Sequence, residues 1–113
     1  MSILEEITAF LNSIPIPVET GTFSEEPPDV YAVITPIADT FGYHADNRPE
    51  FEVQEARISL FSKVNYQQKK NQILGGLLDL GFTVTNRRYL GYENDTAYHH
   101  YAMDVAKHYR LEE

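Results

Sequence analysis

The chain has 113 residues, of which 42% are hydrophobic, and it carries a net charge of −8 and no cysteine. This length and composition predict one globular domain over residues 1–113, and they exclude disulfides, thiolate catalysis and zinc held by sulfur. The acidic excess makes nucleic acid a poor partner, no apolar run is long enough for a membrane span, and the acidic N-terminus does not resemble a signal peptide, so we expect neither membrane insertion nor secretion.

The first predicted element is a short amphipathic helix over residues 3–12. Ser2 and Glu5 have the spacing of a capping box, and apolar residues then recur at the period of a helix. Pro15 and Pro17 end the pattern, because proline removes a helical hydrogen bond and disfavours helical backbone in the residue before it.

The middle of the chain predicts three strands and one long loop. Residues 16–23 and 30–37 predict strands, the first at an edge of the sheet. Residues 38–50 contain turn-forming residues and predict a loop, which is long for a domain of this size. Residues 51–63 predict a long strand whose apolar residues change phase midway. Either a bulge near residues 55–56 or burial on different faces along the strand would explain the change.

A second helix is predicted after the long strand. Asn65 is placed to cap its start, with Gln68 three residues on, and Gly81 is placed to end it. Gly75 and Gly76 lie inside the helical pattern, where each glycine costs about 1 kcal/mol. This pair predicts either a kink or a close approach of the helix backbone to another element.

Two closing strands complete the predicted fold. Residues 82–92 and 97–111 predict strands, joined by a turn at residues 93–95. The order α-β-β-β-α-β-β predicts an α+β fold. We expect a two-layer sandwich with a largely antiparallel sheet and two helices on one face. The residues predicted to form its core are Ile7, Phe10, Leu11, Val33, Ile58, Leu60, Ile73, Leu74, Leu77, Met103 and Val105.

The stretch YENDTAYHHYAMDV, residues 92–105, raises the question of a catalytic or metal site. Adjacent strand residues point to opposite faces, so His99 and His100 cannot readily hold one metal ion. Catalytic zinc needs three convergent ligands, which this spacing does not provide. Asp104 lies about 13 Å along the strand from His100, too far for a hydrogen bond. We therefore expect ordinary strand positions, with no catalytic residues and no metal.

The whole pattern of elements resembles one family. The segments that carry the resemblance are EARISLFSK, LLDLGF and YENDTAYHHYAMDV, in this order along an acidic chain. They resemble the small tail-completion proteins of long-tailed bacteriophages and prophages, the tail-terminator or head–tail joining group. The resemblance is one of element order with weak local motifs, and it carries no functional residue across.

This resemblance implies a non-enzymatic structural protein without a cofactor. It implies a ring of identical subunits, often a hexamer, that binds the tail tube protein and the head connector. The protein would be assembled in the bacterial cytoplasm and end at the head–tail interface of the virion. Two other readings stay open: a different small phage or bacterial interaction module, such as a head-completion protein or an injection-system adaptor, and a small enzyme.

The long loop is predicted to contact the partner. It combines aromatic residues and arginine, which are enriched at interfaces, with glycine and asparagine, which allow rearrangement. In the alternative, Phe41 and Tyr43 fold back onto the domain's own core. The predicted partner-binding residues are Phe41, Tyr43, His44, Asp46, Asn47 and Arg48.

Overall fold

The computed structural model describes residues 2–14, 16–20, 28–41, 44–45, 48–49 and 51–110, and for residues 19–20, 41, 44–45 and 48–49 it describes the backbone alone. The described residues form two helices, a five-stranded sheet and a two-stranded sheet. In chain order the elements are α1 (Ile3–Ser13), β1 (Val18–Thr20), β2 (Val30–Phe41), β3 (His44–Ala45), β4 (Arg48–Pro49), β5 (Phe51–Ser62), α2 (Tyr66–Asp79), β6 (Thr83–Glu93) and β7 (Tyr98–Arg110).

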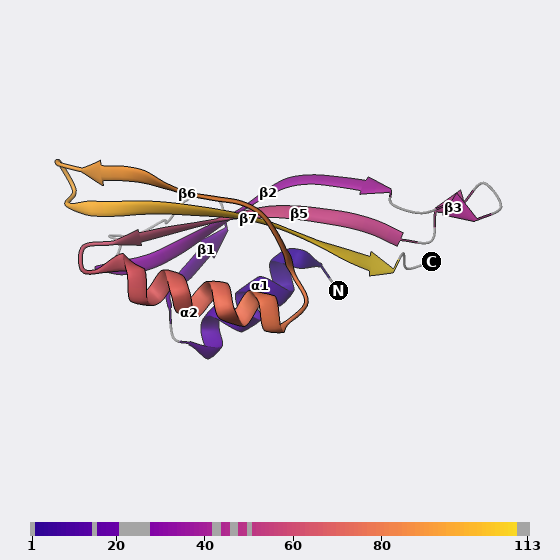
Figure 1. The fold of residues 1–113 in the computed structure, drawn as a ribbon, viewed down its shortest axis with the longest axis horizontal. Coiled ribbons are helices and arrows are strands. Elements are labelled where there is room, and N and C mark those ends of the chain that lie inside the picture. Colours follow the sequence, from indigo (N-terminus) through magenta and orange to yellow (C-terminus); the bar gives the residue numbers. More distant parts are fainter. Residues whose placement is uncertain are drawn as a thin grey trace.

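The predicted α+β class, with two helices and a largely antiparallel sheet, is confirmed for this part of the chain. The strand order of the main sheet is β1-β2-β5-β7-β6, and all its neighbouring strands are antiparallel except β1 and β2. Both helices lie on one side of this sheet (Figure 1). Neither described helix is long and apolar enough to cross a membrane.

The predicted loop over residues 38–50 is wrong in its first part. Strand β2 continues through Phe41, because its ladder with β5 runs on to the pair of Phe41 and Glu52. The turn-forming residues that suggested a loop begin only at Gly42. Two short strands that were not predicted, β3 and β4, follow and pair with each other.

Helix α1 begins at the predicted residue. The Ser2 hydroxyl accepts a hydrogen bond from the Glu5 amide at 3.2 Å, which satisfies one of the free donors of the first turn. The amide of Ile3 donates to the side-chain oxygen of Gln54 at 2.8 Å, so β5 supplies a second cap that the sequence did not reveal. The helix then buries an apolar stripe against the sheet, and this stripe consists of Ile3, Ile7 and Leu11.

The core lies between the two helices and the sheet. Of the predicted core residues, eight are fully buried: Ile7, Leu11, Ile58, Leu60, Ile73, Leu77, Met103 and Val105. Phe10 and Leu74 are only partly buried and pack against the cluster. The prediction for Val33 is wrong, because Ala32 and Ile34 turn toward the helices and the residue between them turns to the opposite face.

Strand β5 keeps one phase along its buried half. Gln54, Ala56, Ile58, Leu60 and Ser62 are all buried, so the strand carries no bulge and does not change faces. The irregularity lies in the neighbouring strand β2, between residues 36 and 38, opposite the position where a bulge was predicted in β5. The prediction therefore found the right place in the sheet and the wrong strand.

Helix α2 is capped as predicted, and its packing against α1 explains one of its two adjacent glycines. The side chain of Asn65 accepts a hydrogen bond from the Gln67 amide at 3.0 Å. A Cβ atom built on Gly76 would overlap the ring of Phe10 from α1, so this glycine permits a close approach of the two helices. The second of the two predicted explanations is therefore the right one.

A polar contact ties α1 to the last strand. The Glu6 carboxylate accepts hydrogen bonds from the ammonium of Lys107 at 2.6 Å and from the hydroxyl of Tyr109 at 2.7 Å. Burial, and then the hydrogen bond to Glu6, raise the pKa of Tyr109 above its ordinary value. The helix is thus fixed to β7 by charge-assisted hydrogen bonds as well as by its apolar stripe.

Candidate functional site

The outer face of the sheet, which is the face turned away from both helices, carries an aromatic cluster. Strand register places Tyr31 opposite Phe61, and Phe61 opposite His100. The ring of Phe61 stacks on that of Tyr31 with centroids 4.9 Å apart, and on that of His100 with centroids 4.2 Å apart. Tyr98 meets Tyr31 edge to face at 5.4 Å. Three neighbouring strands therefore build one continuous cluster from Tyr31, Phe61, Tyr98 and His100.

Tyr98 fixes one end of this cluster. Its hydroxyl donates to the carbonyl oxygen of Pro28 at 2.6 Å, and its side chain is 5% exposed. The ammonium of Lys63 lies 5.0 Å from the centre of its ring, at the distance of a cation–π contact. The cluster is thus held in place by hydrogen bonding and stacking.

His100 has an unused hydrogen-bonding atom. Its Nε2 is buried and has no hydrogen-bond partner in the described part of the chain. Burial lowers the pKa of His100 below its ordinary value, Glu93 opposes that shift, and Arg57 adds to it. The neutral form of the ring is therefore favoured at this position.

An ion pair lies beside the cluster on the same face. The guanidinium of Arg57 donates two hydrogen bonds to the Asp104 carboxylate, at 2.8 and 3.1 Å, across the β5–β7 ladder. The hydrogen bond to Asp104 raises the pKa of Arg57. Asp104 is therefore engaged by Arg57, in agreement with the prediction that it does not pair with His100.

His99 points to the other face of the strand, as predicted. Its Nδ1 lies 2.9 Å from the hydroxyl oxygen of Tyr89, and its ring lies 5.6 Å from that of Tyr66 at the start of α2. Tyr66 also stacks on Tyr101 at 5.8 Å. The two adjacent histidines thus belong to separate aromatic groups on opposite faces of the sheet.

The predicted partner-binding residues cannot be placed as a set. Tyr43, Asp46 and Asn47 lie outside the described residues. Phe41, His44 and Arg48 are described by their backbone alone, in β2, β3 and β4.

Sequence reasoning missed the aromatic cluster. Tyr31 and Phe61 lie thirty residues apart in sequence, and only the strand register shows that they are neighbours. The available signal was alternation: Tyr31 and Phe61 are sequence neighbours of the core residues Ala32 and Leu60, so they lie on the opposite face of their strands. Arg57 was missed for the same reason, because its partner Asp104 comes from another strand.

Among the described residues, this part of the outer face combines aromatic rings, the imidazole of His100 and the ion pair of Arg57 with Asp104. No group of three side chains able to hold a metal ion is found among the described residues. Neither a protein-family model nor a curated protein matches this sequence.

Proposed function

We propose that this protein is a non-enzymatic virion assembly protein that completes the tail of a long-tailed phage and joins it to the head connector. It acts as a ring of identical subunits, for which the resemblance implies six copies. Its place is the head–tail interface of the virion, and assembly occurs in the cytoplasm of the bacterial host. The proposed family rests on the resemblance in the order of elements and in the segments LLDLGF and YENDTAYHHYAMDV, and this resemblance implies no cofactor.

The observation that carries the proposal is the aromatic cluster on the outer face. Tyrosine and other aromatic residues are enriched where proteins contact one another, and the residues that dominate binding energy lie in well-packed aromatic groups. Stacking holds Phe61 between Tyr31 and His100, so little side-chain entropy would be lost on binding. A preformed aromatic cluster, in which Tyr31, Phe61 and His100 are half-buried, suits a structural subunit that binds other proteins.

The shape of the domain supports the same function. Both helices lie on one side of the sheet, so neither helix covers the outer face (Figure 1). The domain is elongated, with principal extents of 54, 26 and 24 Å. Such a shape can contact more than one neighbour along its length, as a subunit between a tail tube and a head connector must.

The test is electron microscopy of particles produced when the gene is disrupted in the genome that encodes it. The proposal predicts heads without tails, together with free or overlong tails, and restoration of joined particles when the gene is supplied in trans. Normal tailed particles that remain infectious would overturn the proposal. Normal tails, together with heads that lose their DNA, would indicate a head-completion protein instead of a tail-completion protein.

A further inference from the structure

The charge of the chain is unevenly divided between two parts. Residues 66–93, which comprise α2, β6 and their connection, contain four basic residues and two acidic ones, a net charge of +2. The whole chain has a net charge of −8, so the remaining residues carry −10. One part of this acidic protein is therefore basic, and its basic residues are Lys69, Lys70, Arg87 and Arg88.

The basic part and an acidic part lie at opposite edges of the sheet. Strand β6 is one edge, with α2 beside it, and β1 is the other edge, in contact with α1. On the β1 side, Glu5 of α1 is exposed. Asp29, just before β2, is exposed too, but it lies 4.0 Å from the ammonium of Lys63 in an ion pair. Glu6 is already engaged by Lys107, so it does not contribute a free charge. The β6 edge is thus net positive, and the carboxylate of Glu5 is the exposed negative charge available on α1.

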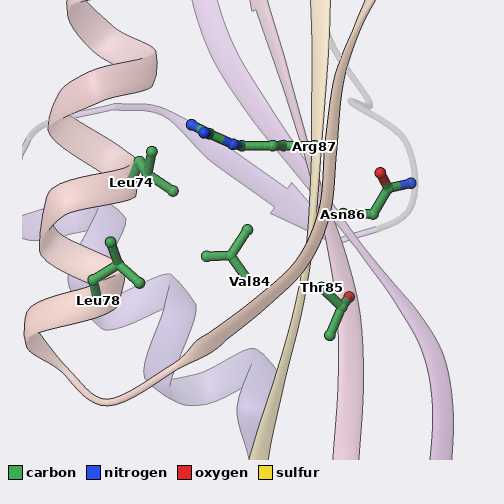
Figure 2. Close-up of a pocket in the computed structure, with 6 residues that line it drawn as sticks. All are labelled: Leu74, Leu78, Val84, Thr85, Asn86 and Arg87. Atoms are coloured by element: carbon green, nitrogen blue, oxygen red, sulfur yellow. The ribbon is translucent and has the colours of Figure 1, made fainter.

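The basic edge contains a groove lined by both apolar and polar residues. We call it the α2–β6 groove; it is lined by Leu74, Leu78, Val84, Thr85, Asn86 and Arg87 and has a volume of about 470 Å³. Leu74 and Leu78 lie on the side of the helix that faces Val84, and Arg87 extends from the strand toward Leu74, whereas Thr85 and Asn86 point away (Figure 2). The side chain of Leu78 is 55% exposed and that of Tyr89, farther along β6, is 44% exposed. Apolar side chains rimmed by charge are typical of a protein-binding surface.

The outer side of α1 offers a matching surface. Leu4, Glu5, Thr8, Ala9 and Asn12 line a shallow hollow there, which combines apolar atoms with one exposed carboxylate. A second copy of the chain therefore presents both an apolar patch for the groove and a negative charge for its basic rim. We call this surface the α1 hollow.

We infer that the α2–β6 groove of one copy binds the α1 hollow of the next copy, head to tail. Because the two surfaces differ, each bound copy keeps one free surface for a further copy. Such heterologous contacts close into a ring when the rotation between neighbouring copies closes, and they otherwise extend into an open filament. Attraction between the basic rim and the acidic edge gives the contact its direction, and like-charge repulsion disfavours an acidic edge against another acidic edge. The inference rests on the proposed function, because that function requires a ring.

The absence of cysteine from the sequence makes crosslinking a clean test. Leu78→Cys marks the groove and Ala9→Cys marks the hollow, and the two variants carry tags of different mass. They are mixed at high concentration and treated with a short bis-maleimide. The expected product is the mixed dimer, at a yield at least fivefold above that of Ile37→Cys mixed with Ala9→Cys. Ile37 is a suitable control because it is exposed and lines neither surface.

The role of charge is tested on the same crosslink. Arg87→Glu on the groove variant should lower the yield of the mixed dimer at least threefold, whereas Arg110→Glu, an equal charge change at the exposed end of β7, should leave it unchanged. A mixed-dimer yield no higher than the control pair would overturn the inference. So would efficient crosslinking of Leu78→Cys with itself, which would indicate a two-fold symmetric contact.

The crosslink and the particle images can fail separately. If gene disruption gives abnormal particles but no mixed dimer forms, the tail-completion function stands and the proposed head-to-tail contact is wrong. If a specific mixed dimer forms but particles remain normal after gene disruption, the head-to-tail contact stands and the tail-completion function is wrong.

Discussion

The ring of Phe10 in α1 lies so close to Gly76 in α2 that a Cβ atom on residue 76 would overlap ring carbons. The neighbouring Gly75 has no atom within 4 Å of the corresponding position. Two adjacent glycines of one helix therefore differ only in what lies beside them, and this contact sets how closely the two helices pack over the sheet.

This difference predicts opposite effects of two alanine substitutions. Gly75→Ala should raise the free energy of unfolding by about 1 kcal/mol, since alanine favours a helix interior over glycine. Gly76→Ala has the same gain in helix propensity, yet it should lower stability because Phe10 must leave its place. Urea unfolding of both variants measures the effect. A Gly76→Ala protein as stable as Gly75→Ala would show that the helices do not meet as described.

A second pair of neighbours tests how α2 faces the core. Leu77 is fully buried, whereas Leu78 is 55% exposed. Leu77→Ala should lower the free energy of unfolding by about 2–5 kcal/mol, since it removes buried carbon and leaves a cavity. Leu78→Ala should change it by less than about 0.5 kcal/mol, as surface substitutions do. Equal losses at the two positions would contradict the orientation of the helix.

Local patterns predicted the helices well. For α1 and α2, a capping residue and a 3.6-residue period are contained in one short segment, so their starts could be predicted. Which residues of β5 face the core could not be predicted in this way, because the extra residue that shifts the register lies in the neighbouring strand β2, near Ile37. Strand pairing joins segments far apart in the sequence, and no single segment records which strand carries a bulge.

The turn between β6 and β7 stores backbone strain. Ala97 has a φ of 63°, in the left-handed region, and its amide donates to the carbonyl oxygen of Glu93 at 2.7 Å. A residue with a Cβ loses roughly 1 kcal/mol in this conformation relative to glycine. We expect Ala97→Gly to raise the melting temperature. Ala102→Gly, in a buried and extended part of β7, should lower it. A lower melting temperature in both variants would show that Ala97 has ordinary backbone geometry.

Acid should destabilise the protein through His100. Burial lowers the pKa of His100 below 6.5, its ordinary value. The unfolded chain therefore binds more protons than the folded chain just below that pH, so stability is present above pH 6.5 and is lost as the pH falls through the folded pKa. His100→Leu should flatten this part of the curve of unfolding free energy against pH. His108→Leu, at an exposed position of the same strand, is the control. An unchanged slope in His100→Leu would show that this ring does not titrate with unfolding.

The candidate site was less predictable than the fold. Alternation along β7 separated the two histidines correctly, because it depends only on the strand itself. The neighbours of His100 could not be predicted from β7 alone. Phe61 and Tyr31 belong to other strands, and their register is fixed by the whole sheet. Arg57 likewise has no sequence signal for its partner until β5 and β7 are aligned.

The most direct test of the account is stoichiometric complementation in an extract. Cells that make all other particle components, but lack this gene, are lysed, and purified protein is added in increasing amounts while joined particles are counted by electron microscopy. As a structural subunit, the protein should restore particles in proportion to the amount added, until every tail holds a fixed number of copies. Full restoration by much less than one copy per particle would instead show turnover, and it would contradict a structural role.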